Sequence, residues 1–162
     1  MQTKYDDVIY ALRIYHDIPR LIAEEWATIR NCEEQRDKVG ETAAQLQEVV
    51  VENGGKHGDK TARLASEDRD TLFQQEIDSR LSHIDELRRI REWIRRGLAC
   101  IDQRDRDALD LAYIGPQNAA QRLVWQGKGW KEVAALVGRS ESYVRHKAYE
   151  AMDKIRNMKE EG

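Results

Sequence analysis

The chain has 162 residues, of which 40% are apolar and 35% charged, and its formal net charge is −3. This length suits one domain of ordinary size or two small ones, and the high share of charge is typical of long helices with solvated faces. No apolar run approaches the roughly 18 residues that a membrane-spanning helix needs, and the N-terminus lacks the apolar core of a signal peptide, so we expect a cytoplasmic protein without membrane contact.

The cysteines and histidines show no spacing that indicates a metal site or a catalytic centre. Cys32 and Cys100 each lie inside a helical pattern and are expected to be buried or half-buried free thiols, as in a reducing cytoplasm. The four histidines contain no pair at helical ligand spacing, so we predict no metal and no cofactor. No Ser-His-Asp or Cys-His arrangement emerges, and we expect no enzymatic activity.

Apolar side chains recur at steps of three and four from about Tyr5 to Lys38. This spacing predicts one long amphipathic helix or two in near continuity, depending on whether Asp17 caps a second helix or Pro19 kinks a single one. Residues 40–52 remain ambiguous, because a helix-favouring run is followed by three valines that favour extended chain. Residues 53–60 read NGGKHGDK and predict a turn or mobile loop.

A second long helix is predicted over roughly 61–101, with a narrow apolar seam of the coiled-coil kind. The seam consists of Leu64, Leu72, Ile77, Leu81, Ile84, Leu87, Ile94, Leu98 and Ile101. A stripe this narrow is unstable alone in water and needs a partner helix. The partner is either the first helix, folded back as an antiparallel hairpin, or a helix of a second chain, and we expect some of both.

Two shorter helices are predicted next. The segment DRDALDLAYIG after Arg104 forms one, which ends at Gly115-Pro116, and a second runs from about Asn118 to Gln126. We expect this second helix to open a three-helix unit, in which its apolar residues pack under the two helices that follow. These residues are Leu123, Val124 and Trp125.

The segment from Trp130 to Arg156, WKEVAALVGRSESYVRHKAYEAMDKIR, predicts two helices joined by a short turn. Gly138 supplies the positive φ that ends the first helix, and Ser140 can cap the second. Ala134 stands where the two helices approach most closely. The buried stripe of the second helix is Val144, Ala148, Ala151, Met152 and Ile155. This is the helix-turn-helix pattern, whose second helix enters a DNA major groove, although an ordinary helical hairpin has similar spacing.

Charge is distributed unevenly in a way that agrees with DNA binding. Residues 127–159 carry eight basic and four acidic side chains, a net charge of +4, whereas residues 1–60 carry eight basic and twelve acidic ones, a net charge of −4. A local basic face on an acidic protein is what a confined contact with phosphates requires. The two ends of the chain are therefore expected to have different partners.

The predicted DNA-contacting residues fall into two groups. Those expected to face the bases are Ser142, Tyr143, Arg145, His146 and Tyr149. Arg145 is the strongest candidate, because its planar fork matches the O6 and N7 acceptors of guanine. Those expected to hold phosphates, and so to set the register without reading sequence, are Lys128, Lys131, Arg139 and Lys147.

The stretch GKGWKEVAALVGRSESYVRHKA resembles the promoter-reading helix-turn-helix in region 4 of sigma factors, with its pattern G-x-[ST]-[WY]-K-E-[IV]-A before a Gly, a Ser-x-Ser and a Val-Arg. The whole layout resembles small phage and prophage transcriptional regulators of the RinA/ArpU type. This resemblance implies regulation of phage genes, with host RNA polymerase as a possible partner.

One departure from that family concerns a Tyr-Ile pair that usually lies just before the turn into the helix-turn-helix. Here Tyr113-Ile114 is separated from Trp130 by fifteen residues. Either Val124-Trp125 takes this role, which we favour, or the chain has an inserted helix. Gly129 also replaces the usual Ser or Thr cap.

Together these features predict an all-α protein in two parts. Residues 1–101 form a long antiparallel helical hairpin for dimerisation or interaction, and residues 102–162 form a sigma region-4-like helix-turn-helix domain. The expected function is sequence-specific binding of double-stranded DNA in transcription control, with the protein as a homo-oligomer, most simply a dimer. Two alternatives are a phage small terminase subunit and a protein-interaction module that acts on RNA polymerase.

Overall fold

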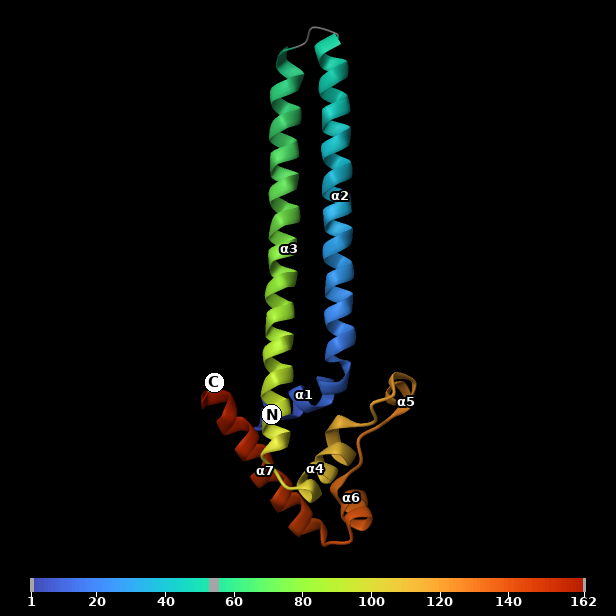
Figure 1. The fold of residues 1–162 in the computed structure, drawn as a ribbon, viewed down its shortest axis with the longest axis vertical. Coiled ribbons are helices and arrows are strands. Elements are labelled where there is room, and N and C mark those ends of the chain that lie inside the picture. Colours follow the sequence, from blue (N-terminus) through green and yellow to red (C-terminus); the bar gives the residue numbers. More distant parts are fainter. Residues whose placement is uncertain (1, 53–55, 162) are drawn as a thin grey trace. The chain divides into compact units, whose positions relative to one another are not determined.

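The computed structural model describes the backbone of residues 2–52 and 56–161 and the side chains of residues 2–40 and 67–159. All regular structure within these ranges is helical, and they contain no strand, so the predicted all-α class is confirmed (Figure 1). The chain divides into two compact units. We call Met1–Arg20 with Glu86–Gly162 the terminal unit, and Leu21–Asp85 the central unit.

The first predicted helical stretch is divided in the structure. Helix α1 spans Asp6–Ile14, a short 3₁₀ helix η1 spans Tyr15–Asp17, and α2 spans Ile18–Glu52. Pro19 lies in the first turn of α2, where its missing N–H has no helical partner to lose. The pattern therefore marks two helices in near continuity, and residues 40–52, which the sequence leaves ambiguous, are helical.

Helix α3 spans Lys56–Ala99 and begins earlier than the sequence predicts. The predicted turn over residues 53–60 is wrong for residues 56–60, whose backbone is helical, while residues 53–55 lie outside the described range. A glycine inside a helix costs only about 1 kcal/mol, so Gly58 weakens a long helix without ending it.

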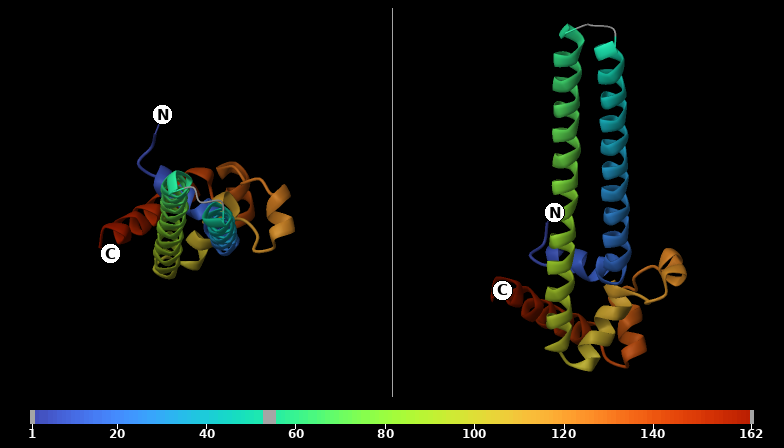
Figure 2. Two further views of the ribbon diagram at one scale, coloured as in Figure 1. Left: turned by 90° about the horizontal axis from the view of Figure 1, so that it is seen from above. Right: turned by 45° about the horizontal axis from the view of Figure 1, so that its top comes forward.

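Helices α2 and α3 run antiparallel within the central unit. Glu25 of α2 accepts from Arg80 of α3 at 3.3 Å, while Arg36, further along α2, donates to Gln74, which lies earlier in α3, at 3.1 Å. Figure 2 shows the two helices side by side in both of its views. The described core between them is thin: its buried members are Ile29, Ile77 and Ile84.

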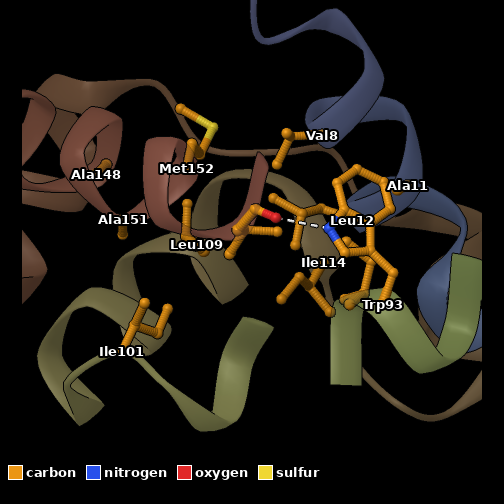
Figure 3. Close-up of a cluster of buried hydrophobic side chains, with 12 residues drawn as sticks. Val8, Ala11, Leu12, Trp93, Ile101, Leu109, Ile114, Ala148, Ala151 and Met152 are labelled. Carbon is orange, nitrogen blue, oxygen red and sulfur yellow. Dashed lines mark hydrogen bonds between the residues drawn. The ribbon is translucent and has the colours of Figure 1, made fainter. Parts of the chain in front are cut away.

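The terminal unit contains the remaining helices. They are α4 (Gln103–Leu109), the π-helical turn η2 (Asp110–Ile114), α5 (Ala119–Val124), α6 (Trp130–Val137) and α7 (Glu141–Glu161). The last turns of α3 also belong to this unit. Trp93 of α3 is buried and donates its indole N–H to the carbonyl of Ile155 in α7 at 2.6 Å (Figure 3).

The main core of the terminal unit joins both ends of the chain. Its buried residues are Val8, Ala11, Leu12, Trp93, Ile94, Ile101, Leu109, Ile114, Ala148, Ala151, Met152 and Ile155 (Figure 3). The sequence predicts a boundary between two parts at residue 101, whereas the observed terminal unit contains residues from both sides of that position. Helix α1 and the end of α3 share a core with α7, since apolar side chains of all three are buried in one cluster.

Helix α5 does not pack as the sequence predicts. Leu123 and Val124 are 88% and 83% exposed, so they do not lie under α6 and α7. Trp125 packs instead against Gly115, where an added Cβ would come within 2.8 Å of the indole ring. Tyr113 and Ile114, and not Val124 and Trp125, occupy the place beside α6: Ile114 is buried, and the ring of Tyr113 meets that of Trp130 at 5.9 Å. Helix α5 is therefore not part of the packing beneath α6 and α7.

An ion pair anchors helix α5. Arg122 of α5, whose side chain is only 11% exposed, bonds to Asp17 at 2.8 Å and donates to the carbonyls of Pro116 and Gln117. Asn118 accepts from the amides of Ala120 and Gln121 and so caps the helix.

Candidate nucleic-acid interface

The turn between α6 and α7 is closed by local hydrogen bonds. Gly138 has φ +76°, and its N–H and that of Arg139 both donate to the carbonyl of Ala134, at 2.9 and 3.1 Å. The Ser140 hydroxyl accepts from the amide of Tyr143 at 3.3 Å, which caps the start of α7 as the sequence predicts. Gly138 and Ser140 thus fix the direction in which α7 leaves the turn.

The inner faces of α6 and α7 rest on α4 and η2. A second buried cluster consists of Ala108, Ala112, Val133, Ala134 and Val144. Further along α7, Ala148, Ala151, Met152 and Ile155 are buried in the main core, so the whole predicted buried stripe of α7 is in place. The first turns of α7 are therefore supported from behind.

The first two turns of α7 expose the predicted base-facing residues on the opposite side. Ser142 and Arg145 are exposed, Tyr143 is 47% exposed, and the side chain of His146 is 72% exposed. Within the described part of the chain, Arg145 makes no ion pair. This arrangement leaves a guanidinium, an imidazole and a hydroxyl accessible on adjacent turns.

Glu150 moderates the positive charge of this face. Its carboxylate lies 3.1 Å from the His146 imidazole and accepts a hydrogen bond from Lys147 at 3.4 Å. The hydrogen bond to Glu150 raises the pKa of Lys147 above its usual value, so this side chain stays protonated. An exposed ion pair of this kind contributes little to stability and is easily exchanged for a phosphate.

Two of the predicted phosphate-binding side chains are held together by one aromatic ring. The guanidinium of Arg139 lies 5.7 Å from the centroid of Tyr143, and the ammonium of Lys147 lies 5.9 Å from it. Tyr143 thereby brings together a cation of the α6–α7 turn and a cation of α7. Lys131 is exposed, and Lys128 is half-buried with its ammonium 4.0 Å from Glu132.

The positive face is bounded by a hollow beside the turn, which contains acidic side chains. Asp102, Asp105, Arg139 and Lys147 all line it. Burial, reinforced by Asp102, raises the pKa of Asp105, while Lys147 acts in the opposite direction. Acidic and basic side chains thus lie side by side in this hollow.

Tyr149 differs from the prediction. Its ring stacks on Tyr5 at 5.2 Å with an angle of 4° between the planes, and it meets Trp130 edge-on at 6.1 Å. It is half-buried by these contacts and is not a free side chain on the helix surface. Of the residues predicted to face bases, those that the structure leaves exposed are therefore Ser142, Tyr143, Arg145 and His146.

Sequence reasoning missed the contribution of the chain's first residues to this surface. Lys4 pairs with Asp153 of α7 at 3.1 Å, and the Tyr5 hydroxyl donates to the same carboxylate at 3.2 Å. No local pattern links positions almost 150 residues apart, so a single sequence carries no signal for these contacts.

Comparison with known protein families, with curated proteins and with solved structures finds no match for this chain. Within the described residues, no three His, Cys, Asp or Glu side chains come together as metal ligands would. None of the helices in the described part of the chain is both long enough and apolar enough to cross a bilayer.

Proposed function

We propose that this protein binds double-stranded DNA in a sequence-specific way and regulates transcription, and that it is encoded by a phage or prophage. The observation that carries the proposal is the start of α7, where exposed Arg145 and His146 project from a helix whose opposite side is fully buried. A rigid helix with basic side chains on its free face suits insertion into a major groove.

In this proposal α6 and α7 act as a helix-turn-helix, and α7 is the recognition helix. Arg145 reads guanine, with Ser142 and His146 beside it in the groove. The residues that hold phosphates on either side are Lys128, Lys131, Arg139 and Lys147. The Tyr143 ring keeps Arg139 and Lys147 in place for this task.

The antiparallel helices of the central unit serve in this proposal to hold two copies together. Two recognition helices then reach successive major grooves about 34 Å apart. A single short helix with few phosphate contacts binds weakly at cellular salt, so joining two sites matters for function. Where its side chains are described, the central unit has a thin core with Ile29, Ile77 and Ile84 as the buried members, which supports a need for further partners.

The test is selection of binding sequences from a random DNA pool, followed by two variants. Arg145→Ala should erase most of the discrimination between selected and random DNA, a loss of about 1–3 kcal/mol, while the helicity stays unchanged. Lys131→Ala should weaken binding to both DNAs alike and reduce the slope of log affinity against log salt by about 0.9.

Unchanged footprints for both variants would contradict these assigned roles. A chain that ignores DNA even at low salt would favour a protein-interaction module acting on RNA polymerase, for which the exposed Leu123 and Val124 on α5 are a suitable contact. A ring of many copies in solution would favour a phage small terminase subunit.

A further inference from the structure

The outward side of α7 is exposed in its first two turns and partly covered after them. Ser142, His146, Tyr149 and Asp153 follow one another at steps of three and four and therefore lie on one side of the helix. Ser142 and His146 are exposed, whereas Tyr149 and Asp153 are each half-buried. The chain's own N-terminal segment covers this second half of the stripe.

Lys4 and Tyr5 hold this segment in place through several contacts. The Tyr5 ring stacks on Tyr149 at 5.2 Å, and its hydroxyl donates to Asp153 at 3.2 Å. The Lys4 ammonium bonds to the same carboxylate at 3.1 Å and lies 5.0 Å from the Tyr5 ring. Just before α1, the Thr3 amide and hydroxyl donate to Asp6, which fixes the backbone at this point.

These contacts change the charge that α7 presents. Without a partner, the Asp153 carboxylate would repel phosphates on the stripe that also carries His146. Lys4 neutralises it and still exposes 56% of its own side chain, with ammonium protons left for a second acceptor. The hydrogen bonds and charges of Tyr5 and Asp153 raise the pKa of Lys4, so the ammonium remains protonated.

The position of Lys4 along α7 matches the edge of a groove. Asp153 lies seven residues after His146, which is about 10 Å along the helix axis. The major groove is about 12 Å wide, so a helix that reads bases with its first turns brings this point near the sugar-phosphate backbone. A cation there is placed for a phosphate and not for a base.

From these contacts we infer that residues 3–5 form a second DNA-contacting element, in which Lys4 binds a backbone phosphate and Tyr5 is a positioning residue. The inference rests on the proposed function and adds to it a contact from the opposite end of the chain. Lys4 sets affinity and register, while discrimination between sequences stays with Arg145.

The experiment uses the full chain and a fluorescent random-sequence DNA duplex, with affinity measured over a series of salt concentrations. Lys4→Gln should lower the slope of log affinity against log salt by about 0.9, the value for one phosphate contact. The matched control is Lys159→Gln. Lys159 has a similarly exposed side chain, 53%, and also pairs with an aspartate, Asp7, but it packs over Trp93 on another side of α7. Its removal should leave the slope unchanged.

A pair of variants at Tyr5 tests its positioning role. Tyr5→Phe retains the ring stack and should keep the slope close to that of the wild type, whereas Tyr5→Leu should lower it towards the Lys4→Gln value. Both should retain the Arg145-dependent preference for selected DNA and the wild-type helicity. Equal slopes for Lys4→Gln and Lys159→Gln, with wild-type binding intact, would overturn the inference alone. A wild-type chain that does not bind the duplex at low salt would overturn the proposed function and this inference with it.

Discussion

Gly138 has the strictest backbone requirement in the α6–α7 turn. Its φ of +76° lies in the left-handed region, where a Cβ costs about 1–2 kcal/mol, although the space around it is open. Gly129, at the start of α6, also has open space around it but has a φ of −70°, which any residue adopts. The two glycines differ in backbone conformation and not in crowding.

Gly138→Ala should therefore lower the free energy of unfolding by about 1–2 kcal/mol. For Gly129→Ala the free energy of unfolding should stay within about 0.5 kcal/mol of the wild type. Alanine is the weaker helix cap, but it also lowers the conformational entropy of the unfolded chain, and the two effects offset each other. Chemical denaturation followed by circular dichroism measures both. Similar losses for the two variants would show that the turn does not depend on the left-handed conformation.

At this scale the sequence predicts what depends on neighbouring residues. The buried stripe of α7, the stop at Gly138 and the cap at Ser140 all follow from spacing and from local backbone chemistry, and the structure has all three. The covering of Tyr149 by Tyr5 depends on a contact across nearly the whole chain, so no local rule predicts it.

Helix α5 shows how a short element escapes prediction. Its apolar residues Leu123, Val124 and Trp125 are consecutive, and such a run has no helical period that would identify a buried side. The deciding interaction is the ion pair of Arg122 with Asp17, 105 residues earlier. By contrast, the long helices are confirmed because dozens of residues repeat the same spacing.

Replacing Leu123 by Gln should leave the free energy of unfolding within about 0.5 kcal/mol of the wild type, because the side chain is 88% exposed. Leu109→Ala, at a fully buried position of the main core, should cost about 2–5 kcal/mol. Thermal or denaturant unfolding of the two variants gives the comparison. A large loss for Leu123→Gln would mean that α5 packs against the protein after all, as the sequence alone suggests.

Across the whole molecule, the two compact units have net charges of opposite sign. The terminal unit carries 19 basic and 15 acidic residues, a net charge of +4, and the central unit carries 8 basic and 15 acidic ones, a net charge of −7. An acidic central unit is repelled by DNA, which favours binding through the terminal unit only. In the proposed function the central unit then serves for contact with protein.

We expect the full chain to have twice the mass of one chain in solution, because the described side chains of the central unit form a thin core and leave large apolar residues exposed. Leu72 is 64% exposed, and Trp26 and Leu81 are each 37% exposed. Replacing Leu72 and Leu81 by Gln should shift the mass towards that of one chain without loss of helicity. Light scattering coupled to size-exclusion chromatography measures both. A single-chain mass at concentrations that saturate DNA would rule out pairing through this unit.

The shared core of the first and last helices also has a consequence for biosynthesis. Leu12 emerges from the ribosome 140 residues before Met152, the residue of α7 that lies in the same cluster. At typical rates of synthesis this interval is on the order of ten seconds. During this interval the apolar side of α1 cannot pack against α7. A transcript cut short before the final helix would therefore yield a product in which the apolar side of α1 stays exposed. Chaperones and proteases recognise exposed apolar surface of this kind.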